Sequence, residues 1–288
     1  MKKIACIFVN YNNSQKSIDC IDSILNQEEG DFEKRIIIVD NKSVESEYEI
    51  VEEFCARNEK IELVSLMENI GYFPALNYAI TKTIEDLDAY EFLIIGNNDL
   101  IFREDFFQTL GEFETDSSMF VISPDIVNLD DNHQNPQIIV KYSLPQLVFL
   151  ELYHFSYFFA SLFGVMSRVM RFRSSQKSKP GFEKSQFISI GYGACYVLTK
   201  KYIQQIGELP SYLFLMNEEN ALSDLVFRNN GRIYYYNKLV VNHVEHSSVG
   251  QAPKSKLYKI AQKSYKISKK HFNNRLLFDR ALIEDGKN

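Results

Sequence analysis

The segments KIACIFVNYNN at residues 3–13 and KRIIIVDNKS at residues 34–43 decide the fold class. Each begins as a short apolar run rich in β-branched residues and ends in polar residues that favour turns. Between them, residues 14–25 have apolar positions at a spacing typical of a helix. A strand, a helix and a second strand predict a βαβ unit, in which the two strands lie parallel in one sheet.

The same alternation continues along the chain. In the first 140 residues we expect strands at Ile4–Val9, Arg35–Val39, Ile61–Leu66 and Phe92–Ile95, and helices at Ser14–Leu25, Ser46–Arg57 and Pro74–Ile84. The later residues predict strands at Phe187–Leu198 and Arg232–Val241, and helices at Lys200–Ile206, within 212–231 and within 251–280. The predicted fold class is therefore α/β, with a mostly parallel, Rossmann-like central sheet flanked by helices. We expect one domain at 1–250 and a basic helical tail at 251–288.

A hydrophobic insert at residues 143–184 interrupts this pattern. Residues 144–170 read LPQLVFLELYHFSYFFASLFGVMSRVM, which approaches the length of a membrane span. Glu151 and His154 would then lie in the hydrocarbon at considerable cost. Two interpretations remain: a helix at the surface of an anionic membrane, favoured by the aromatic residues and the basic flank, or a helix or helical hairpin packed on the core.

The charge of the chain limits its partners. There are 32 Lys and Arg against 38 Asp and Glu, giving a net charge of −6. A dedicated nucleic-acid-binding protein needs a basic face, so this balance argues against that class. Residues 141–184 hold seven basic and two acidic side chains, and residues 251–288 hold ten and three. An anionic partner would therefore meet these two segments.

The cysteines and the N-terminus indicate a cytoplasmic protein. None of the four cysteines forms a CxxC pair, so neither a zinc site nor a disulfide framework is indicated. The first apolar run, which ends before Asn10, is too short for a signal sequence or a transmembrane helix. An apolar content of 45% excludes a disordered chain.

Polar clusters follow the first four predicted strands, at Asn10–Asn13, Asp40–Ser43, Glu68–Tyr72 and Gly96–Asp99. Open α/β sheets bind ligands at the carboxyl ends of their strands, so these clusters predict a binding edge. Neither GxGxxG nor a Walker A sequence follows the first strand. The phosphates of a nucleotide bound here would therefore be neutralised by a metal ion or by side chains.

Three groups of residues fit one chemistry. Asn97 and Asp99 follow an apolar strand and offer the oxygen ligands that Mg²⁺ or Mn²⁺ prefers. Glu218 and Glu219 begin a helix, where the dipole favours ionised carboxylates unless burial raises their pKa towards that of a base. His243 and His246 follow the last strand and could complete a metal shell with neutral imidazole.

These residues occur within motifs similar to those of the family-2 glycosyltransferases with a GT-A fold, in particular the rhamnosyltransferase-like branch. The similar segments, in order, are IFVNYNN, IIIVDNKS, ENIGYFPALNYAI, IIGNNDLIF, GYGACYVLTKK and LFLMNEENALSDLVFRNNG. The resemblance covers about residues 3–250, and the insert and the tail have no counterpart. Three departures stand out: Asn97 replaces the usual Asp of the metal motif, Glu218-Glu219 replaces Glu-Asp, and Pro74-Ala75 replaces a glycine.

The resemblance implies an inverting glycosyltransferase. It would move a sugar from a nucleotide-diphosphate sugar, such as a UDP- or dTDP-sugar, to a saccharide or lipid-linked saccharide acceptor, in the assembly of a surface polysaccharide. Glu219, or its neighbour Glu218, would be the catalytic base. The nucleotide sugar would be bound by Asn10, Asn12, Asp40, Asn41, Asn69, Gly71, Asn77, Asn97 and Asn98. The divalent metal, Mn²⁺ or Mg²⁺, would be bound by Asp99, Asn97, His243 and His246. The enzyme would work in the cytoplasm, with peripheral contact to the inner face of the cell membrane.

Two other functions remain compatible with these residues. The first is a nucleotide-sugar-binding or scaffold subunit with weak activity, suggested by the loss of one carboxylate at Asn97. The second is a nucleotidyltransferase, which uses a similar sheet and metal. That class normally has a basic, glycine-rich loop after the first strand, and Asn10–Asn13 does not supply one.

Overall fold

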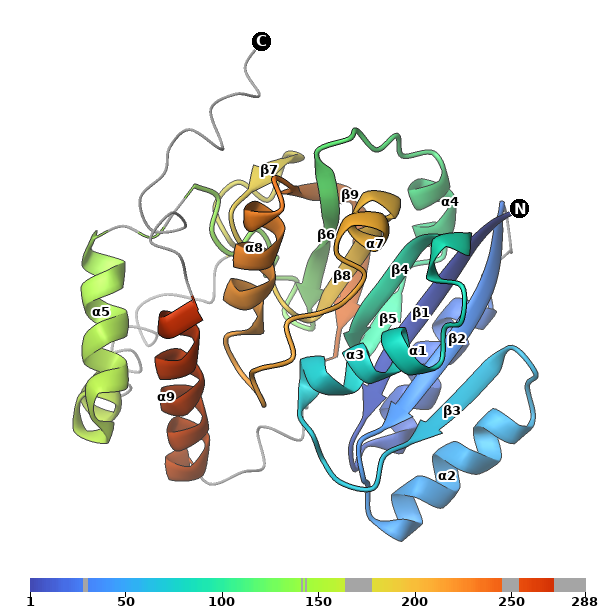
Figure 1. Ribbon diagram of the computed structural model, residues 1–288, viewed down its shortest axis with the longest axis horizontal. Helices are drawn as coiled ribbons and strands as arrows, with labels where there is room; N and C mark the ends of the chain where they lie inside the picture. Colours follow the sequence, from blue (N-terminus) through green and yellow to red (C-terminus); the bar gives the residue numbers. More distant parts are fainter. Residues whose placement is uncertain (28–30, 141, 143, 164–177, 245–253, 272–288) are drawn as a thin grey trace.

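The structure of the protein is a computed structural model that describes residues 1–27, 31–140, 142, 144–163, 178–244 and 254–271. Its centre is a sheet in the order β3-β2-β1-β4-β8-β6-β9-β5, with β7 paired to β9 (Figure 1). The strands are β1 (Lys2–Asn10), β2 (Phe32–Asp40), β3 (Ile61–Ser65), β4 (Tyr90–Asn97), β5 (Leu100–Phe102), β6 (Met119–Asn128), β7 (Gln186–Ile188), β8 (Cys195–Thr199) and β9 (Arg232–His243).

Helices cover both faces of this sheet. They are α1 (Ser14–Leu25), α2 (Glu45–Ala56), α3 (Tyr72–Lys82), η1 (Leu87–Ala89), α4 (Phe106–Gly111), α5 (Leu144–Phe155), α7 (Lys200–Gln205), α8 (Glu218–Arg228) and α9 (Lys254–His271). Residues 157–163 are also helical. The mixed α/β fold with its helical insert and C-terminal helix confirms the predicted class.

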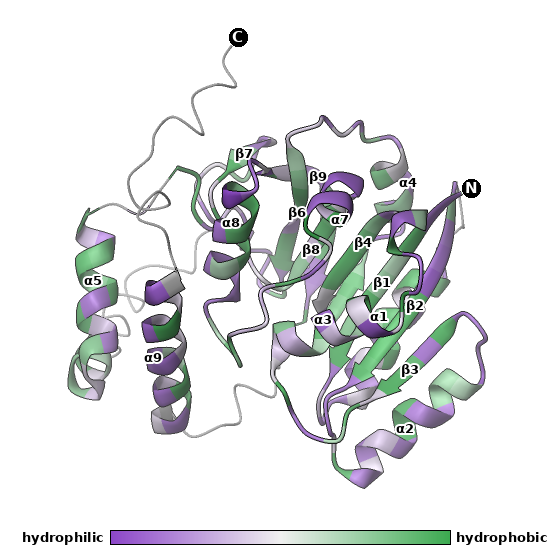
Figure 2. Cartoon of the chain, viewed as in Figure 1, coloured by the Kyte–Doolittle hydropathy of each residue, from purple (hydrophilic) through white to green (hydrophobic). Residues whose placement is uncertain are grey.

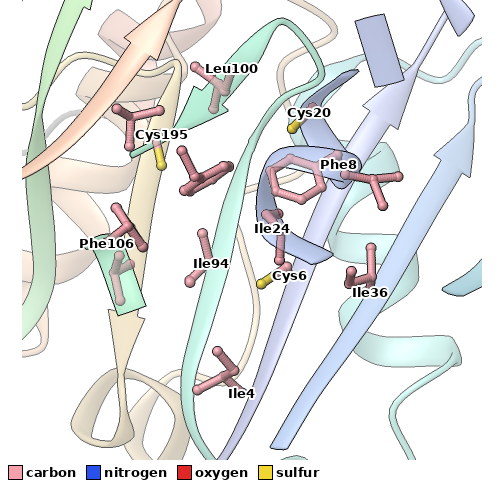
Figure 3. Close-up of a cluster of buried hydrophobic side chains, with 14 of the residues drawn as sticks. Ile4, Cys6, Phe8, Cys20, Ile24, Ile36, Ile94, Leu100, Phe106 and Cys195 are labelled. Atoms are coloured by element: carbon pink, nitrogen blue, oxygen red, sulfur yellow. The ribbon is translucent and has the colours of Figure 1, made fainter. Parts of the chain in front are cut away.

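The alternation of side chains along β1 divides the core into two layers. Ile4, Cys6 and Phe8 point into one layer with residues of α1 and α4, as Figure 3 shows for several of them. Ala5 and Ile7 point into the other layer, under α3, α7 and α8. All four cysteines are buried and free. In Figure 2 most of the strands are green, which marks hydrophobic residues, as expected for strands that are buried on both faces of the sheet.

The parallel order holds for only part of the sheet. Strands β3, β2, β1 and β4 are parallel neighbours, whereas β8 is antiparallel to both β4 and β6. The single strand expected at Phe187–Leu198 is wrong: β7 and β8 are separated by 189–194. Gly193 in this connection contacts Glu219 of α8, and a continuous strand would not allow that approach.

Helix α5 of the insert lies outside the core. None of the residues of α5 is buried, and α5 packs on α9, which in turn contacts α8. Figure 1 shows α5 as the outermost element on this side, with α9 between it and α8. Of the two interpretations of the insert, the described part of α5 therefore does not support a core helix. Within the described residues, no helix is both long and apolar enough to cross a bilayer.

Candidate active site

Asn10 is the centre of a hydrogen-bond network that joins the ends of three neighbouring strands. It is fully buried, and its amide nitrogen donates to Asp40 Oδ2 at 2.9 Å and to the Ser43 hydroxyl at 3.2 Å. Its amide oxygen accepts from the Ser17 hydroxyl at 2.9 Å and from Asn98 Nδ2 at 3.3 Å. Since protein groups use both ends of its side chain, Asn10 acts at this edge by holding Asp40 and Asn98 in place.

Asp40 and Asn12 are brought together by the loops that follow β1 and β2. Asp40 ends β2, directly opposite Asn10 in the register, and its Oδ1 accepts the backbone N–H of Ser43 at 3.0 Å. The Ser43 hydroxyl accepts the N–H of Asn12 at 2.9 Å. The amide oxygen of Asn12 accepts the N–H of Val44 at 2.8 Å. The two loops therefore form one hydrogen-bonded unit.

The loop after β3 joins this unit through Asn41. The Asn41 amide nitrogen donates to Asn69 Oδ1 and to the Gly71 carbonyl, both at 3.0 Å, and its oxygen accepts the N–H of Ile70 at 2.9 Å. Gly71 has φ +102°, and a Cβ there would lie 2.1 Å from the carbonyl oxygen of Phe214. Only glycine allows this close approach between the donor-side loop and the segment before α8.

Asn77 lies apart from the strand ends. It is in the second turn of α3, and its amide oxygen accepts the backbone N–H of Leu209 at 2.7 Å. At the start of the same helix, the N–H of Tyr72 donates to the carbonyl of Phe214 at 3.0 Å. In this structure Asn77 therefore anchors the segment that leads to α8.

Asp99 and His243 form a buried pair. Leu100 of β5 is in register with His243 of β9, and the N–H of Val244 donates to the Asp99 carbonyl at 2.9 Å. This pairing places Asp99 Oδ1 3.2 Å from His243 Nε2, with both side chains almost completely buried. Neither carboxylate oxygen of Asp99 has a hydrogen-bond partner within the described chain, and neither does His243 Nε2.

The contact on the other side of the ring orients His243. Its Nδ1 lies 2.9 Å from Gln134 Oε1, an oxygen that favours the tautomer with the proton on Nδ1. The same orientation places Nε2 opposite Asp99 Oδ1, at 3.2 Å. An imidazole nitrogen and a carboxylate oxygen that face each other in a buried site are both common ligands of a divalent cation.

The wider metal set is only partly brought together. Asn97 ends β4, two residues before Asp99, and its backbone N–H donates to the Ala194 carbonyl at 2.9 Å. His246 falls outside the described residues. Within the described part of the chain, no group of three or more His, Cys, Asp or Glu side chains could hold a metal ion. Asp99 and His243 fit a divalent cation that takes its remaining ligands from other oxygens and from water.

Glu218 and Glu219 form the first turn of α8, after Asn217 with φ 75°. Burial raises the pKa of Glu218, and the adjacent charge of Glu219 raises it further, while the N–H groups of residues 218 and 216 oppose the change. Burial also raises the pKa of Glu219, and the N–H of Gly193 acts in the opposite direction. Among the residues that the structure describes, Glu218 Oε1 has no hydrogen-bond partner. At least one of these carboxyls is therefore able to accept a proton near neutral pH.

We expect Glu218→Gln to stabilise the protein increasingly as the pH rises. Because its pKa is raised in the folded state, the unfolded chain ionises first, and stability is lost as the pH rises from about 4.3 towards the raised value. Glutamine avoids this loss. The gain in free energy of unfolding should be larger at pH 8 than at pH 5 by on the order of 2 kcal/mol, measured by urea denaturation. The exposed control Glu112→Gln should show no such difference, and equal effects of Glu218→Gln at both pH values would contradict the assignment.

Gly193 and Ala194 connect the two ends of the site. A Cβ at Gly193 would lie 2.7 Å from Glu219 Oε1, so the backbone passes directly against this carboxyl. The next carbonyl, of Ala194, accepts the N–H of Asn97 at the end of β4. Glu219, the candidate base, and Asn97, a candidate metal ligand, therefore lie at the same edge of the sheet. The backbone of Gly193 and Ala194, just before β8, lies between them.

Two tyrosines at this edge were not among the predicted site residues. The Tyr72 hydroxyl donates to the Gly193 carbonyl at 3.2 Å, and its pKa is raised by burial and by negative charges that include Glu219 and Asp99. The Tyr142 hydroxyl donates to Asn220 Oδ1 at 3.2 Å, and its pKa is raised by burial and by Glu219. Tyr72 lies within the ENIGYFPALNYAI segment, whereas no motif marks Tyr142.

Comparisons with known proteins bear on the family and the fold of the chain. The family model described as "Glycosyl transferase family 2" matches residues 6–177. A search of curated proteins gave no match.

Solved glycosyltransferase structures share the fold at low sequence identity. They include S. aureus TarS 1–349 in complex with UDP-GlcNAc, with 15% identity, TM-score 0.55 and coverage of 90% of this chain and 64% of the other. The mannosyltransferase PcManGT from Pyrobaculum calidifontis with GDP-Man and Mn²⁺ has 13% identity, TM-score 0.53 and coverage of 85% and 57%. GalNAc-T7 with UDP, GalNAc and Mn²⁺ has 11% identity, TM-score 0.57 and coverage of 86% and 45%. The matched region thus spans less than two thirds of each of these structures.

Proposed function

The chain belongs to glycosyl transferase family 2, and from this premise we propose that it transfers a sugar from a nucleotide-diphosphate sugar to an acceptor hydroxyl with inversion. One observation carries the proposal: the Gly193-Ala194 backbone lies against Glu219, whose pKa is raised, and bonds to Asn97, two residues before Asp99 with its unpartnered oxygens. A donor of this class is supported by the structural relatives, whose titles name UDP-GlcNAc and GDP-Man.

In this proposal the nucleoside lies at the ends of β1 and β2. Asp40 would bind the base, and Asn12 would line the pocket beside it. The other donor-side residues named from the sequence would support this pocket by fixing the loops that form it. They are Asn10, Asn41, Asn69, Asn77 and Asn98, together with Gly71.

Asp99, His243 and the amide of Asn97 would hold Mn²⁺ or Mg²⁺ next to the donor diphosphate, and His246 remains a proposed ligand. A divalent cation bound there would neutralise the charge that develops on the leaving diphosphate. The replacement of an acidic ligand by Asn97 lowers the negative charge of the set, so we expect weaker metal binding than with two carboxylates.

We expect Gln134→Leu to lower the affinity for Mn²⁺ by about tenfold to a hundredfold, because the ligand His243 loses the acceptor that fixes its tautomer. Calorimetric titration with Mn²⁺ measures this without turnover. Gln134→Glu keeps an acceptor and should bind Mn²⁺ more tightly than Gln134→Leu. Gln108→Leu, on an exposed helix face, is the control. An unchanged affinity in Gln134→Leu would exclude a positioning role for Gln134.

Glu219 would remove the proton from the acceptor hydroxyl as its oxygen attacks the anomeric carbon. This single displacement inverts the anomeric configuration and needs no covalent intermediate. Glu219 is preferred to Glu218 because it contacts the Gly193 backbone and lies beside Tyr142, whereas Glu218 is only 4% exposed.

We place the reaction in the cytoplasm, in the assembly of a surface polysaccharide, with a hexose or rhamnose as the transferred sugar. The acceptor would be a saccharide or a lipid-linked saccharide. A screen of UDP-, dTDP- and GDP-sugars for thermal stabilisation, with and without Mn²⁺, tests the donor class. Stabilisation by a nucleotide sugar that increases with Mn²⁺ supports the proposal, and no stabilisation by any of them would contradict it.

Asn97 favours a second candidate, a nucleotide-sugar-binding subunit with weak activity. Calorimetry and product analysis distinguish the two functions. Tight donor binding without transfer to any saccharide acceptor would favour the binding subunit, whereas release of nucleoside diphosphate coupled to glycoside formation identifies the transferase.

A further inference from the structure

The insert helix α5 is mostly apolar, and one stripe of its apolar residues faces outward. Leu144, Val148, Leu152 and Phe155 recur at the spacing of one helix face, and all four are exposed, Leu144 by 71% and Phe155 by 74%. Such a stripe normally faces a core. The helical residues 157–163 extend the apolar surface through Tyr157, Phe158 and Leu162.

The polar side of α5 faces the protein instead. Glu151 accepts hydrogen bonds from Tyr265 and Lys269 of α9. The ring of His154 stacks on Tyr265, with centroids 4.1 Å apart. The carbonyl of His154 also accepts a hydrogen bond from Gln262 at 2.7 Å. Because α9 occupies the polar side of α5, the outward position of the apolar stripe is fixed by specific contacts.

Helix α9 carries a stripe of lysines. Successive residues turn by about 100° around a helix, which places Lys256, Lys259, Lys263, Lys266 and Lys270 along one face. All five are exposed. Acidic residues are absent from Lys254–His271, so this face is uniformly positive.

The direction of the two helices brings both stripes to the same side. Glu151 contacts Lys269, His154 contacts Tyr265, and Tyr157 contacts Tyr258, so the pair is antiparallel. On α5, the apolar stripe is rotated by about 100° around the helix axis, in the direction of increasing residue number, from the residues that contact α9. On α9, the lysine stripe is rotated by about the same angle, in the same sense, from the residues that contact α5. In an antiparallel pair, two equal rotations of this kind bring both stripes to the same side of the pair. The apolar residues of α5 and the lysines of α9 therefore form one continuous surface, which we name the α5–α9 face. Figure 1 shows the two helices side by side.

We propose that the α5–α9 face binds the surface of an anionic lipid bilayer. Aromatic and aliphatic side chains in a stripe beside lysines match the two layers of such a surface, because the apolar groups enter the acyl boundary and the ammonium groups meet the headgroups. A second copy of the chain would present the same row of lysines, and like charges would repel. Charge complementarity thus favours the bilayer over self-association.

The α5–α9 face is attached directly to the acceptor side of the candidate site. The Ser264 hydroxyl of α9 is buried and donates to the Leu215 carbonyl at 2.6 Å, three residues before Glu218. Tyr142, two residues before α5, donates to Asn220. Resting on the proposed function, this attachment assigns an amphiphilic acceptor, with its lipid part in the bilayer and its sugar hydroxyl at Glu219.

Vesicle sedimentation tests the face without donor, metal or turnover. The full chain is mixed with vesicles of phosphatidylcholine alone, or of phosphatidylcholine with phosphatidylglycerol. We expect binding to the anionic vesicles that is at least about tenfold tighter than to the neutral ones and that weakens with salt. The double variant Phe155→Ser/Phe158→Ser should lose about tenfold or more in affinity, since both rings are exposed and their loss does not disturb the core. Leu129→Ser, at an exposed apolar residue away from the α5–α9 face, is the matched control.

The outcomes separate the proposals. Failure of the wild-type chain to bind anionic vesicles, or equal binding by wild type and a folded double variant, would overturn the bilayer surface. If the wild type does not bind vesicles but forms a dimer, and the double variant is a monomer, the α5–α9 face serves self-association. That result would also overturn the bilayer proposal. The proposed function is tested separately, by sugar transfer to a water-soluble saccharide. Vesicle binding can therefore fail while transfer succeeds, and transfer can fail while vesicle binding succeeds.

Discussion

Replacing Glu219 with glutamine should lower kcat for sugar transfer by about a thousandfold. The amide keeps the size of the side chain and can still accept the N–H of Gly193, but it cannot take a proton from the acceptor hydroxyl. Donor affinity should change by less than about twofold, because the removed step occurs only after binding. The measurement is the release of nucleoside diphosphate from the donor that stabilises the protein best, with a panel of saccharide acceptors.

Glu218→Gln is the matched control for the base. It removes the neighbouring carboxyl, which lies deeper in the protein, and it should retain most of the activity. A large loss in this variant with normal turnover by Glu219→Gln would exchange the two roles. Normal turnover in both variants would remove the acidic pair from the chemistry altogether.

Replacing Asp99 with asparagine should reduce transfer by about a hundredfold to a thousandfold and weaken Mn²⁺ binding. The buried pair would lose its carboxylate, while the size of the side chain and the contact of the Asp99 carbonyl with Val244 would remain. A cation held by few protein ligands depends strongly on each charged one. Calorimetry with Mn²⁺, followed by a kinetic assay over a range of Mn²⁺ concentrations, measures the two effects.

The reverse change tests the same charge argument. Asn97→Asp adds a carboxylate at the end of β4, and we expect tighter Mn²⁺ binding, by about tenfold. Weaker binding by Asp99→Asn together with tighter binding by Asn97→Asp would support a metal site whose strength follows its negative charge. An unchanged Mn²⁺ affinity in Asp99→Asn would place the metal elsewhere or exclude it.

The sequence predicts the first half of the fold well because its signals there are local. Strand β1, helix α1 and strand β2 each have a uniform apolar pattern and a polar end, and α1 begins and ends where the pattern predicts. Strand β6 was not predicted. Its segment, MFVISPDIVN, contains Pro124 and Asp125, which are typical of loops. The fold buries that Asp125 beside His133, whose Nδ1 lies 2.6 Å from its carboxylate.

The candidate site shows the same division between local and distant information. Asp99 and Glu219 could be selected because each is an acidic residue next to a predicted strand end or helix start. Gln134 and Tyr142 could not, because their roles come from contacts with His243 and Asn220, which are far away along the chain. Such pairings arise only from tertiary structure, and residue spacing carries no signal for them.

The pairing of β5 with β9 also has a consequence for biosynthesis. The loops around Asp40 are complete once the first hundred residues have left the ribosome, whereas Asp99 gains its imidazole neighbour only when β9 docks in register on Leu100. A nascent chain halted before residue 232 thus lacks the pair of Asp99 and His243. The proposed cation ligands are therefore brought together late in synthesis, after the strands that carry Asn10 and Asp40.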